Sequence, residues 1–140
     1  MRTDRDCVFC KIVRGDLPSF KLFESDRVVS FMDINPYHDG HCLVIVKDHA
    51  PTLLDAEPAD LAEAAQVAQR VAAAASRAGL APDGFNIVQA NGAAAGQTVF
   101  HYHMHIFPRR AGDDAKLNWS QTPGDFERIE ANCKRILAAL

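Results

Sequence analysis

Three histidines alternate with other residues in the stretch His101-Tyr102-His103-Met104-His105. Successive side chains of a β-strand point to opposite faces. We therefore expect the three imidazoles on one face of a strand and the residues between them on the other, packed on the core. Imidazole is nucleophilic near neutral pH, and a neighbouring ring or carbonyl group can fix its tautomer. The row favours attack by a histidine on phosphorus, followed by proton transfer.

A metal ion is the alternative use of the same row. Alternate strand residues lie ~6.7 Å apart, which separates the outer two rings by ~13 Å, whereas zinc binds nitrogen at ~2.1 Å. One ion therefore cannot bind all three rings. Two neighbouring histidines and a carboxylate would still suffice for a catalytic ion, so a metallohydrolase is the second interpretation.

Two of the four cysteines form the pair Cys7-x-x-Cys10. No secretory signal is recognisable, so we expect no disulfides, and the pair then favours a metal or redox role. A tetrahedral zinc ion would need two further ligands. The candidates are the histidine row, His38, His41 and His49. The alternative is a pair of reduced, buried thiols, which is the role we expect for Cys42 and Cys133.

Periodicity and turn residues predict the elements that must position these side chains. The apolar run Cys42–Val46 predicts a strand covered on both faces. Residues 58–78 predict a long helix that ends at Gly79, with one small-residue stripe: Leu61, Ala65, Ala68, Val71 and Ala75. After a loose, charged start we expect helical turns at 7–14, strands at 20–24, 28–33, 85–89 and 98–107, and a helix at 126–139. Hairpin strands with separate helices predict one α+β domain over residues 1–140, on an antiparallel sheet.

Composition excludes several classes of function. The 15 basic and 18 acidic residues give a net charge of -3, which lacks the positive surface that a general nucleic-acid binder needs. We find no run of about 18 apolar residues, so we do not expect a membrane-inserted protein. A cytoplasmic location is the expectation.

The segment 97–105, which reads QTVFHYHMH, resembles the signature of the histidine triad (HIT) family. The resemblance extends to the segment FMDI at 31–34, to His41 and to the segment CVFCKI at 7–12, in the order of the Hint-like branch. It spans residues 7–108. It implies a HIT-like α+β fold with about five antiparallel strands, a long central helix and a C-terminal helix. It also implies a homodimer with a continuous ten-stranded sheet.

The resemblance further implies a purine nucleotide as substrate, of the AMP or GMP type, and a nucleotidyl-histidine intermediate. Carried over, the attacking residue is His103, and Thr98 lies near the leaving group. The full catalytic set implied is His41, Thr98, His101, His103 and His105. Asp33 matches the ribose-binding position. The nucleotide-binding set implied is Phe31, Asp33, Ile34, Leu43, Asn91, Gly96, Gln97, Thr98, His103 and His105.

A structural zinc ion is also implied, because some bacterial relatives hold one at positions that correspond to Cys7, Cys10, His49 and His101. Catalysis by a covalent histidine needs no metal. Ala90 departs from the family, since relatives commonly carry Asn or Gln there to contact the nucleotide. Trp119 resembles an aromatic residue that reaches the partner subunit's site in some relatives, and its alternative role is a core or interface anchor.

Three functions are consistent with these residues. The first is hydrolysis of purine nucleoside 5′-phosphoramidates, such as adenylate linked to an amine or to lysine, and the Hint-like features favour it. The second is hydrolysis or phosphorolysis of dinucleoside polyphosphates. The third is a non-catalytic nucleotide-binding module, which the complete set of His41, Thr98, His103 and His105 opposes.

Overall fold

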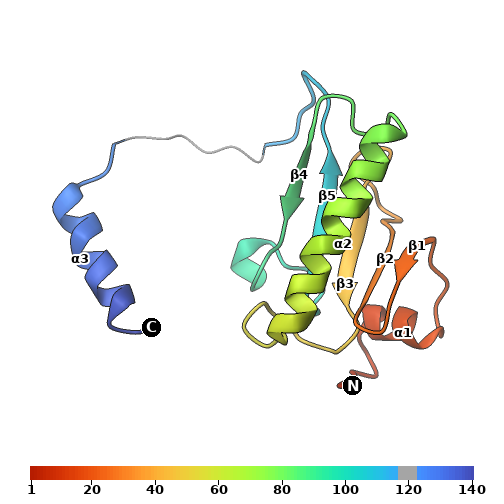
Figure 1. The fold of residues 1–140 in the computed structure, drawn as a ribbon, viewed down its shortest axis with the longest axis horizontal. Coiled ribbons are helices and arrows are strands. Elements are labelled where there is room, and N and C mark those ends of the chain that lie inside the picture. Colours follow the sequence, from red (N-terminus) through yellow and green to blue (C-terminus); the bar gives the residue numbers. More distant parts are fainter. Residues whose placement is uncertain (117–122) are drawn as a thin grey trace.

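The computed structural model describes residues 1–116 and 123–140. Its five strands form one antiparallel sheet in the order β1-β2-β3-β5-β4. The long helix α2 lies across one face of this sheet (Figure 1). The predicted α+β architecture is therefore confirmed. The elements in chain order are α1 (Val8–Arg14), β1 (Lys21–Glu24), β2 (Val28–Met32), β3 (Cys42–Val46), α2 (Pro58–Arg77), β4 (Phe85–Val88), the 3-10 turn η1 (Ala93–Ala95), β5 (His103–Pro108) and α3 (Phe126–Leu137).

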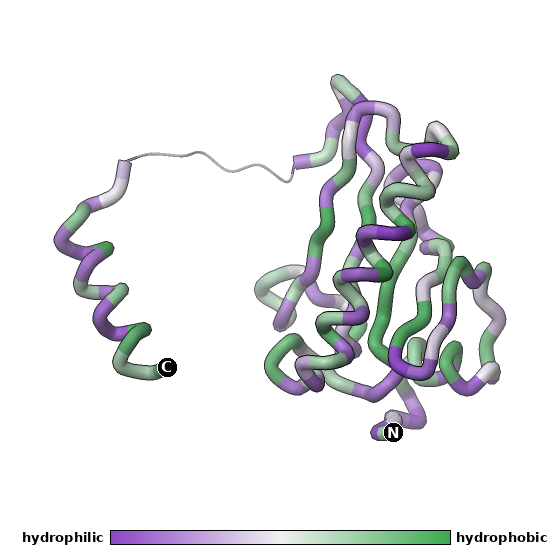
Figure 2. The backbone as a smooth tube through the Cα atoms, viewed as in Figure 1, coloured by the Kyte–Doolittle hydropathy of each residue, from purple (hydrophilic) through white to green (hydrophobic). Residues whose placement is uncertain are grey.

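Strand β3 is the centre of the fold, and all five of its residues are buried, as its uninterrupted apolar run predicts. Figure 2 shows the central strands as the most hydrophobic part of the backbone. One face of the strand packs on α2, and the other contributes to a second apolar cluster with α1. Leu43 pairs with His105, and Ile45 pairs with His103. The two histidines therefore lie on the face of the sheet away from α2.

Strand β5 begins at His103, five residues later than the predicted strand at 98–107. The segment before it is held by bonds outside the ladder, because the Tyr102 N–H donates to the Ala50 carbonyl at 2.6 Å and the His101 N–H donates to the Val99 carbonyl at 2.9 Å. This correction separates His101 from the ladder that aligns His103 and His105.

Helix α2 buries a stripe that is rotated slightly from the predicted one. Ala64, Val67, Ala68 and Ala72 are buried, whereas Ala65, which we placed on the stripe, is exposed. A twisted sheet contacts a helix along a line that is inclined to the helix axis. Several neighbouring alanines have nearly equal apolar character, so the sequence does not show which of them face the sheet. Small residues here let the helix lie close to β3.

Gly40 sets the start of β3. It has φ of +89°, and a Cβ atom there would lie 2.8 Å from Cβ of Leu80. Only glycine combines this backbone conformation with such close packing. The next residue, His41, is thereby delivered to the histidine face at the end of the central strand.

Helix α3 lies apart from the sheet in Figure 1, and its side chains are exposed. Asp125 caps it by accepting the main-chain N–H groups of Glu127 and Arg128 at 3.0 and 3.2 Å. Within the two described ranges, none of the helices has both the length and the apolar character required to cross a bilayer.

Candidate active site and metal centre

The His103 ring is buried and held in one tautomer. The side chain is 4% exposed, and its Nδ1 donates to the main-chain carbonyl of His101 at 2.6 Å. Because a carbonyl oxygen only accepts, the ring proton must lie on Nδ1, which leaves a lone pair on Nε2. Burial lowers the pKa of His103, although the bond to His101 opposes the shift. The ring is therefore uncharged near neutral pH, with Nε2 available to attack.

A second pair of rings is oriented by the turn before β3. The Tyr37 main-chain N–H donates to Nδ1 of His41 at 3.0 Å, so that nitrogen carries no proton. The proton of His41 must be on Nε2, which lies 3.0 Å from Nδ1 of His105 and donates to it. His105 is then left with its own proton on Nε2. Phe107 stacks on the His105 ring at 5.0 Å between centroids and steadies this orientation.

Asp33 completes this cluster, with one carboxylate oxygen 3.4 Å from Nε2 of His41 and 4.0 Å from Nδ1 of His105. The three groups are close enough together to suggest a metal ion. However, a metal needs a lone pair on each ligand atom, and the His41 nitrogen that faces the others carries a proton. The tautomers favour a hydrogen-bonded network here and oppose the metallohydrolase interpretation.

The apolar wall beside the histidines is larger than the predicted one. Phe31 and Leu43 are buried in it, whereas Ile34 is 78% exposed outside the buried cluster, and the role of all three in a purine pocket stays a prediction. Phe9 of α1 joins the wall, with its ring edge-on to Phe31 at 5.8 Å and to His103 at 5.1 Å. We did not predict Phe9 as a site residue. The only signal was its apolar position between Cys7 and Cys10.

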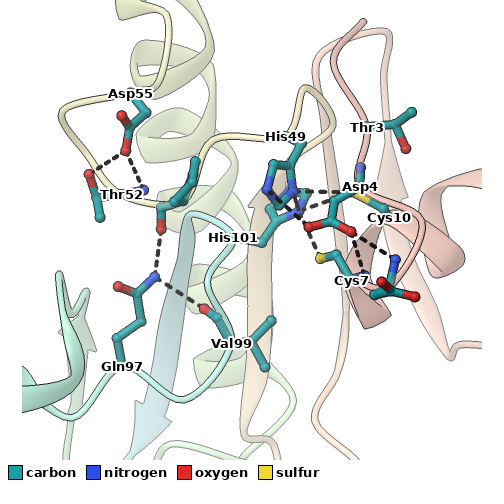
Figure 3. A network of polar contacts seen from close by, with 12 residues as sticks. Thr3, Asp4, Cys7, Cys10, His49, Thr52, Asp55, Gln97, Val99 and His101 are labelled. Carbon is teal, nitrogen blue, oxygen red and sulfur yellow. Dashed lines mark hydrogen bonds and ion pairs between the residues drawn. The ribbon is translucent and has the colours of Figure 1, made fainter.

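The loop before β5 is built by side chains that we had assigned to the nucleotide. Gln97 is buried, accepts the Gly92 N–H at 2.7 Å and donates to the Pro51 carbonyl at 2.6 Å, as part of the network in Figure 3. Asn91 accepts the Leu53 N–H at 2.7 Å. These two side chains hold the loop. Gly96 and Thr98 are exposed on it and remain open to a ligand.

The side-chain amides on either side of Ala90 are engaged with each other. Gln89 and Asn91 are hydrogen-bonded to each other, at 2.6 and 3.1 Å. Trp119 lies outside the described residues.

The four predicted zinc ligands come together from three segments (Figure 3). Nδ1 of His101 lies 3.4 Å from the Cys7 sulfur and 3.6 Å from the Cys10 sulfur, and Nδ1 of His49 lies 3.3 Å from the Cys10 sulfur. Zinc bonds of about 2.1 Å to nitrogen and about 2.3 Å to sulfur at tetrahedral angles place a nitrogen and a sulfur about 3.6 Å apart. The spacing of the ligand atoms therefore fits a tetrahedral zinc ion.

The ring tautomers point to the same conclusion. Nε2 of His101 donates to the Val46 carbonyl at 2.7 Å, so its Nδ1 carries a lone pair. Burial lowers the pKa of His101 to about 4, which keeps the ring neutral. This lone pair faces Nδ1 of His49 at 3.3 Å, close to the separation of about 3.4 Å between two nitrogens on one zinc ion. A cation bound between the two rings would use this lone pair and that of His49 when the His49 ring proton is on Nε2.

Burial lowers the pKa of His105 to about 4, with the neighbouring His103 and His41 adding to the shift and Asp33 opposing it. In the unfolded chain the pKa is about 6.5. Between these values the unfolded state binds a proton that the folded state does not, so the free energy of unfolding falls as the pH drops from about 6.5 towards 4. We expect His105→Asn to flatten this slope.

Urea unfolding of both proteins between pH 5 and 7 measures the slope, in a range where most carboxylates stay ionised. Any loss of metal at low pH affects both proteins and cancels in the comparison. Parallel stability curves would contradict the assignment of a depressed pKa to His105.

The sequence matches a known family and several of its curated members. The HIT domain family model matches residues 14–112. The chain is 44% identical over 108 residues to the adenylylsulfatase HINT3 of Arabidopsis thaliana, a match that covers 77% of this chain and 54% of that protein. It is 36% identical over 138 residues to the adenosine 5′-monophosphoramidase HNT1 of Saccharomyces cerevisiae, covering 98% of this chain and 84% of that one. The chain thus spans about half of the plant protein and most of the yeast one.

Solved structures share the fold. SMU.412c from Streptococcus mutans UA159 superposes with a TM-score of 0.91 at 39% identity, over 98% of this chain and 87% of that chain. A zinc-bound histidine triad family protein from Mycobacterium smegmatis superposes with a TM-score of 0.73 at 41% identity, over 96% of this chain and 98% of that chain.

Proposed function

Because the chain belongs to the histidine triad (HIT) family, we propose that it is a nucleotide hydrolase whose substrates are purine nucleoside 5′-phosphoramidates. In these compounds adenylate or guanylate is joined to an amine or to a lysine side chain. The observation that carries the proposal is the bond from Nδ1 of His103 to the His101 carbonyl, because it leaves Nε2 as a lone pair on a neutral, buried ring.

In the first half of the reaction, Nε2 of His103 bonds to the α-phosphorus and the phosphorus–nitrogen bond breaks. The bonding electrons leave with the amine, which takes a proton from solvent. The resulting nucleotidyl-histidine is cationic, and its Nδ1–H remains on the His101 carbonyl, which stabilises the charge. In the second half, water attacks phosphorus, releases the nucleotide and returns a proton to solvent.

Other residues of the site stabilise the charge that develops on the phosphoryl group and orient the leaving group and the ribose. His105, kept in one tautomer by His41, presents its Nε2–H to the phosphoryl oxygens, where negative charge develops. Exposed Thr98 offers its hydroxyl to the leaving group. Asp33 offers one carboxylate oxygen to the ribose, because the other accepts the Asn35 N–H at 2.8 Å.

The test compares three substrates at equal concentration: an adenosine 5′-phosphoramidate with a fluorescent amine, adenosine 5′-phosphosulfate and a diadenosine polyphosphate. We expect kcat/KM for the phosphoramidate to exceed the others by about tenfold or more, a difference of about 1.4 kcal/mol in barrier. Faster cleavage of the diadenosine polyphosphate would instead identify the protein as a dinucleoside polyphosphate hydrolase. Tight binding of adenylate without turnover of any substrate would make it a binding module.

We also propose that Cys7, Cys10, His49 and His101 hold a structural zinc ion, with all four ligands from protein and no position for substrate. The support is the tetrahedral spacing of the ligand atoms and the lone pair that His101 directs at the cluster from its Nδ1. Zinc bound there ties α1 to the loops that flank β3 and β5. It takes no part in the chemical step.

The active form is proposed to be a homodimer. Strand β4 is an edge of the sheet, and Phe85 and Ile87 on it are 43% and 45% exposed. An edge strand with apolar side chains is a template for pairing with a second copy. Sedimentation equilibrium measures the mass in solution, and a mass of one chain would contradict the proposal.

A further inference from the structure

The charged start of the chain, which we expected to be loose, is held across the cysteine–histidine cluster. The Arg2 carbonyl accepts the His49 N–H at 3.0 Å, and the Arg2 guanidinium pairs with Asp48 at 2.7 Å. On the other side, Arg14 of α1 donates to the Thr3 hydroxyl at 2.9 Å. The N-terminal segment is thus anchored at both the β3–α2 loop and α1, and it passes directly beside the four ligands (Figure 3).

Asp4 is the residue of this segment that faces the cluster. Its main-chain N–H points at the Cys10 sulfur, 3.4 Å away, and one carboxylate oxygen accepts the Cys7 N–H at 3.3 Å. The other carboxylate oxygen lies 4.0 Å from Nε2 of His49. One residue therefore contacts three of the four ligands.

We propose that Asp4 is a positioning residue of the metal centre, which orients His49 and Cys7 without binding the ion itself. The inference rests on the zinc site proposed above. His49 can offer Nδ1 to a metal only if its ring proton is on Nε2. A carboxylate opposite Nε2 favours that tautomer and makes the ligand more basic, as outer carboxylates do at other metal–histidine sites.

The oxygen that accepts the Cys7 N–H also accepts the Asp6 N–H at 2.7 Å. Substitution separates these hydrogen bonds from the negative charge opposite His49. Asp4→Asn keeps an oxygen that accepts the Cys7 N–H but removes the negative charge opposite His49. Asp4→Ala removes both. Asp6→Asn is the matched control, because it makes the same charge change in the same segment, and the Asp6 carboxylate has no hydrogen bond or ion pair within residues 1–116 and 123–140.

The experiment measures zinc affinity in the full-length, zinc-loaded proteins by competition with a chromogenic chelator of known affinity. We expect the zinc dissociation constant to rise about tenfold in Asp4→Asn and further in Asp4→Ala, within the 10–100-fold range of outer-shell substitutions. Asp6→Asn should match the native protein. Nitrogen-15 spectra of His49 give a second readout, since the population protonated on Nδ1 should increase in the metal-free Asp4 variants.

Each outcome bears on a different claim. Affinities of both Asp4 variants within about twofold of Asp6→Asn, with an unchanged His49 tautomer, would overturn the role of Asp4 while leaving the zinc site intact. A native protein that takes up no zinc would overturn the metal centre and this inference together. Neither result touches the hydrolase proposal, which is tested on phosphoramidate turnover.

Discussion

Replacing His103 with alanine is expected to lower kcat by roughly 10⁴-fold or more, because loss of a covalent nucleophile removes the whole reaction path. Within the described residues of the site, the other rings are committed: His41 and His105 bond to each other, and His101 points at the cysteines. None of them presents a free lone pair beside the nucleophile position. Stopped-flow or steady-state release of a fluorescent amine from adenosine 5′-phosphoramidate measures the loss.

Two further variants make this result specific. His103→Asn can still donate to the His101 carbonyl, so it preserves the local bond while removing the nucleophile, and we expect it to be as inactive as His103→Ala. His38→Gln removes a histidine whose ring lies tilted against Tyr37, outside the cluster of His41, His103 and His105, and should retain most of the activity. In the native protein, rapid quenching followed by intact-mass measurement should detect a nucleotidyl adduct. A His103→Ala protein with more than a tenth of native kcat would contradict the covalent mechanism.

Removing the metal is expected to destabilise the protein strongly. The four proposed ligands lie at α1, in the loop after β3 and in the segment before β5, so a zinc ion held by them would cross-link parts of the chain that are far apart in sequence. A ligand that binds only the folded state at a thousand times its dissociation constant contributes about 4 kcal/mol. We expect a loss of this size when native protein is treated with a strong chelator, measured by urea unfolding together with elemental analysis for zinc.

Cysteine variants separate the metal from general thiol effects. Cys10→Ser should reproduce the loss of stability. Cys133, which we expected to be buried, is exposed on α3, so Cys133→Ser should leave stability unchanged. Activity gives a second comparison. Because the His101 carbonyl orients His103, we expect a reduced rate in chelated protein that is still folded, yet within about tenfold of native if no metal acts at phosphorus. Complete loss of turnover in a folded, chelated protein would restore the metallohydrolase interpretation.

Several features of this protein follow from its sequence alone. The run Cys42–Val46 is short, apolar throughout and rich in β-branched residues, which predicts a strand covered on both faces, and it is the central strand. The helix α2 follows from an alanine-rich stretch bounded by Pro58 and Gly79. The alternation of His103, Met104 and His105 places both histidines on one face, because strand periodicity is a property of neighbouring residues.

Other features depended on segments that meet only in the folded chain. His101 lies outside the ladder because Ala50 holds the segment before β5, so its ring turns to the cysteines rather than to the substrate face. Phe9 enters the apolar wall because α1 packs against β2 and β3. Periodicity contains no information about either contact.

The chemical roles of the histidines were decided in the same way. Their spacing identifies a row of imidazoles, but the tautomer of each ring depends on the donor or acceptor placed opposite it. Those partners are the His101 carbonyl for His103, the Tyr37 N–H for His41 and the Val46 carbonyl for His101. Sequence alone therefore determined that imidazoles alternate along one segment and predicts that they carry the chemistry, whereas tertiary structure decided which nitrogen of each ring is free to act, because a proton's position is set by hydrogen bonds that only folding brings together.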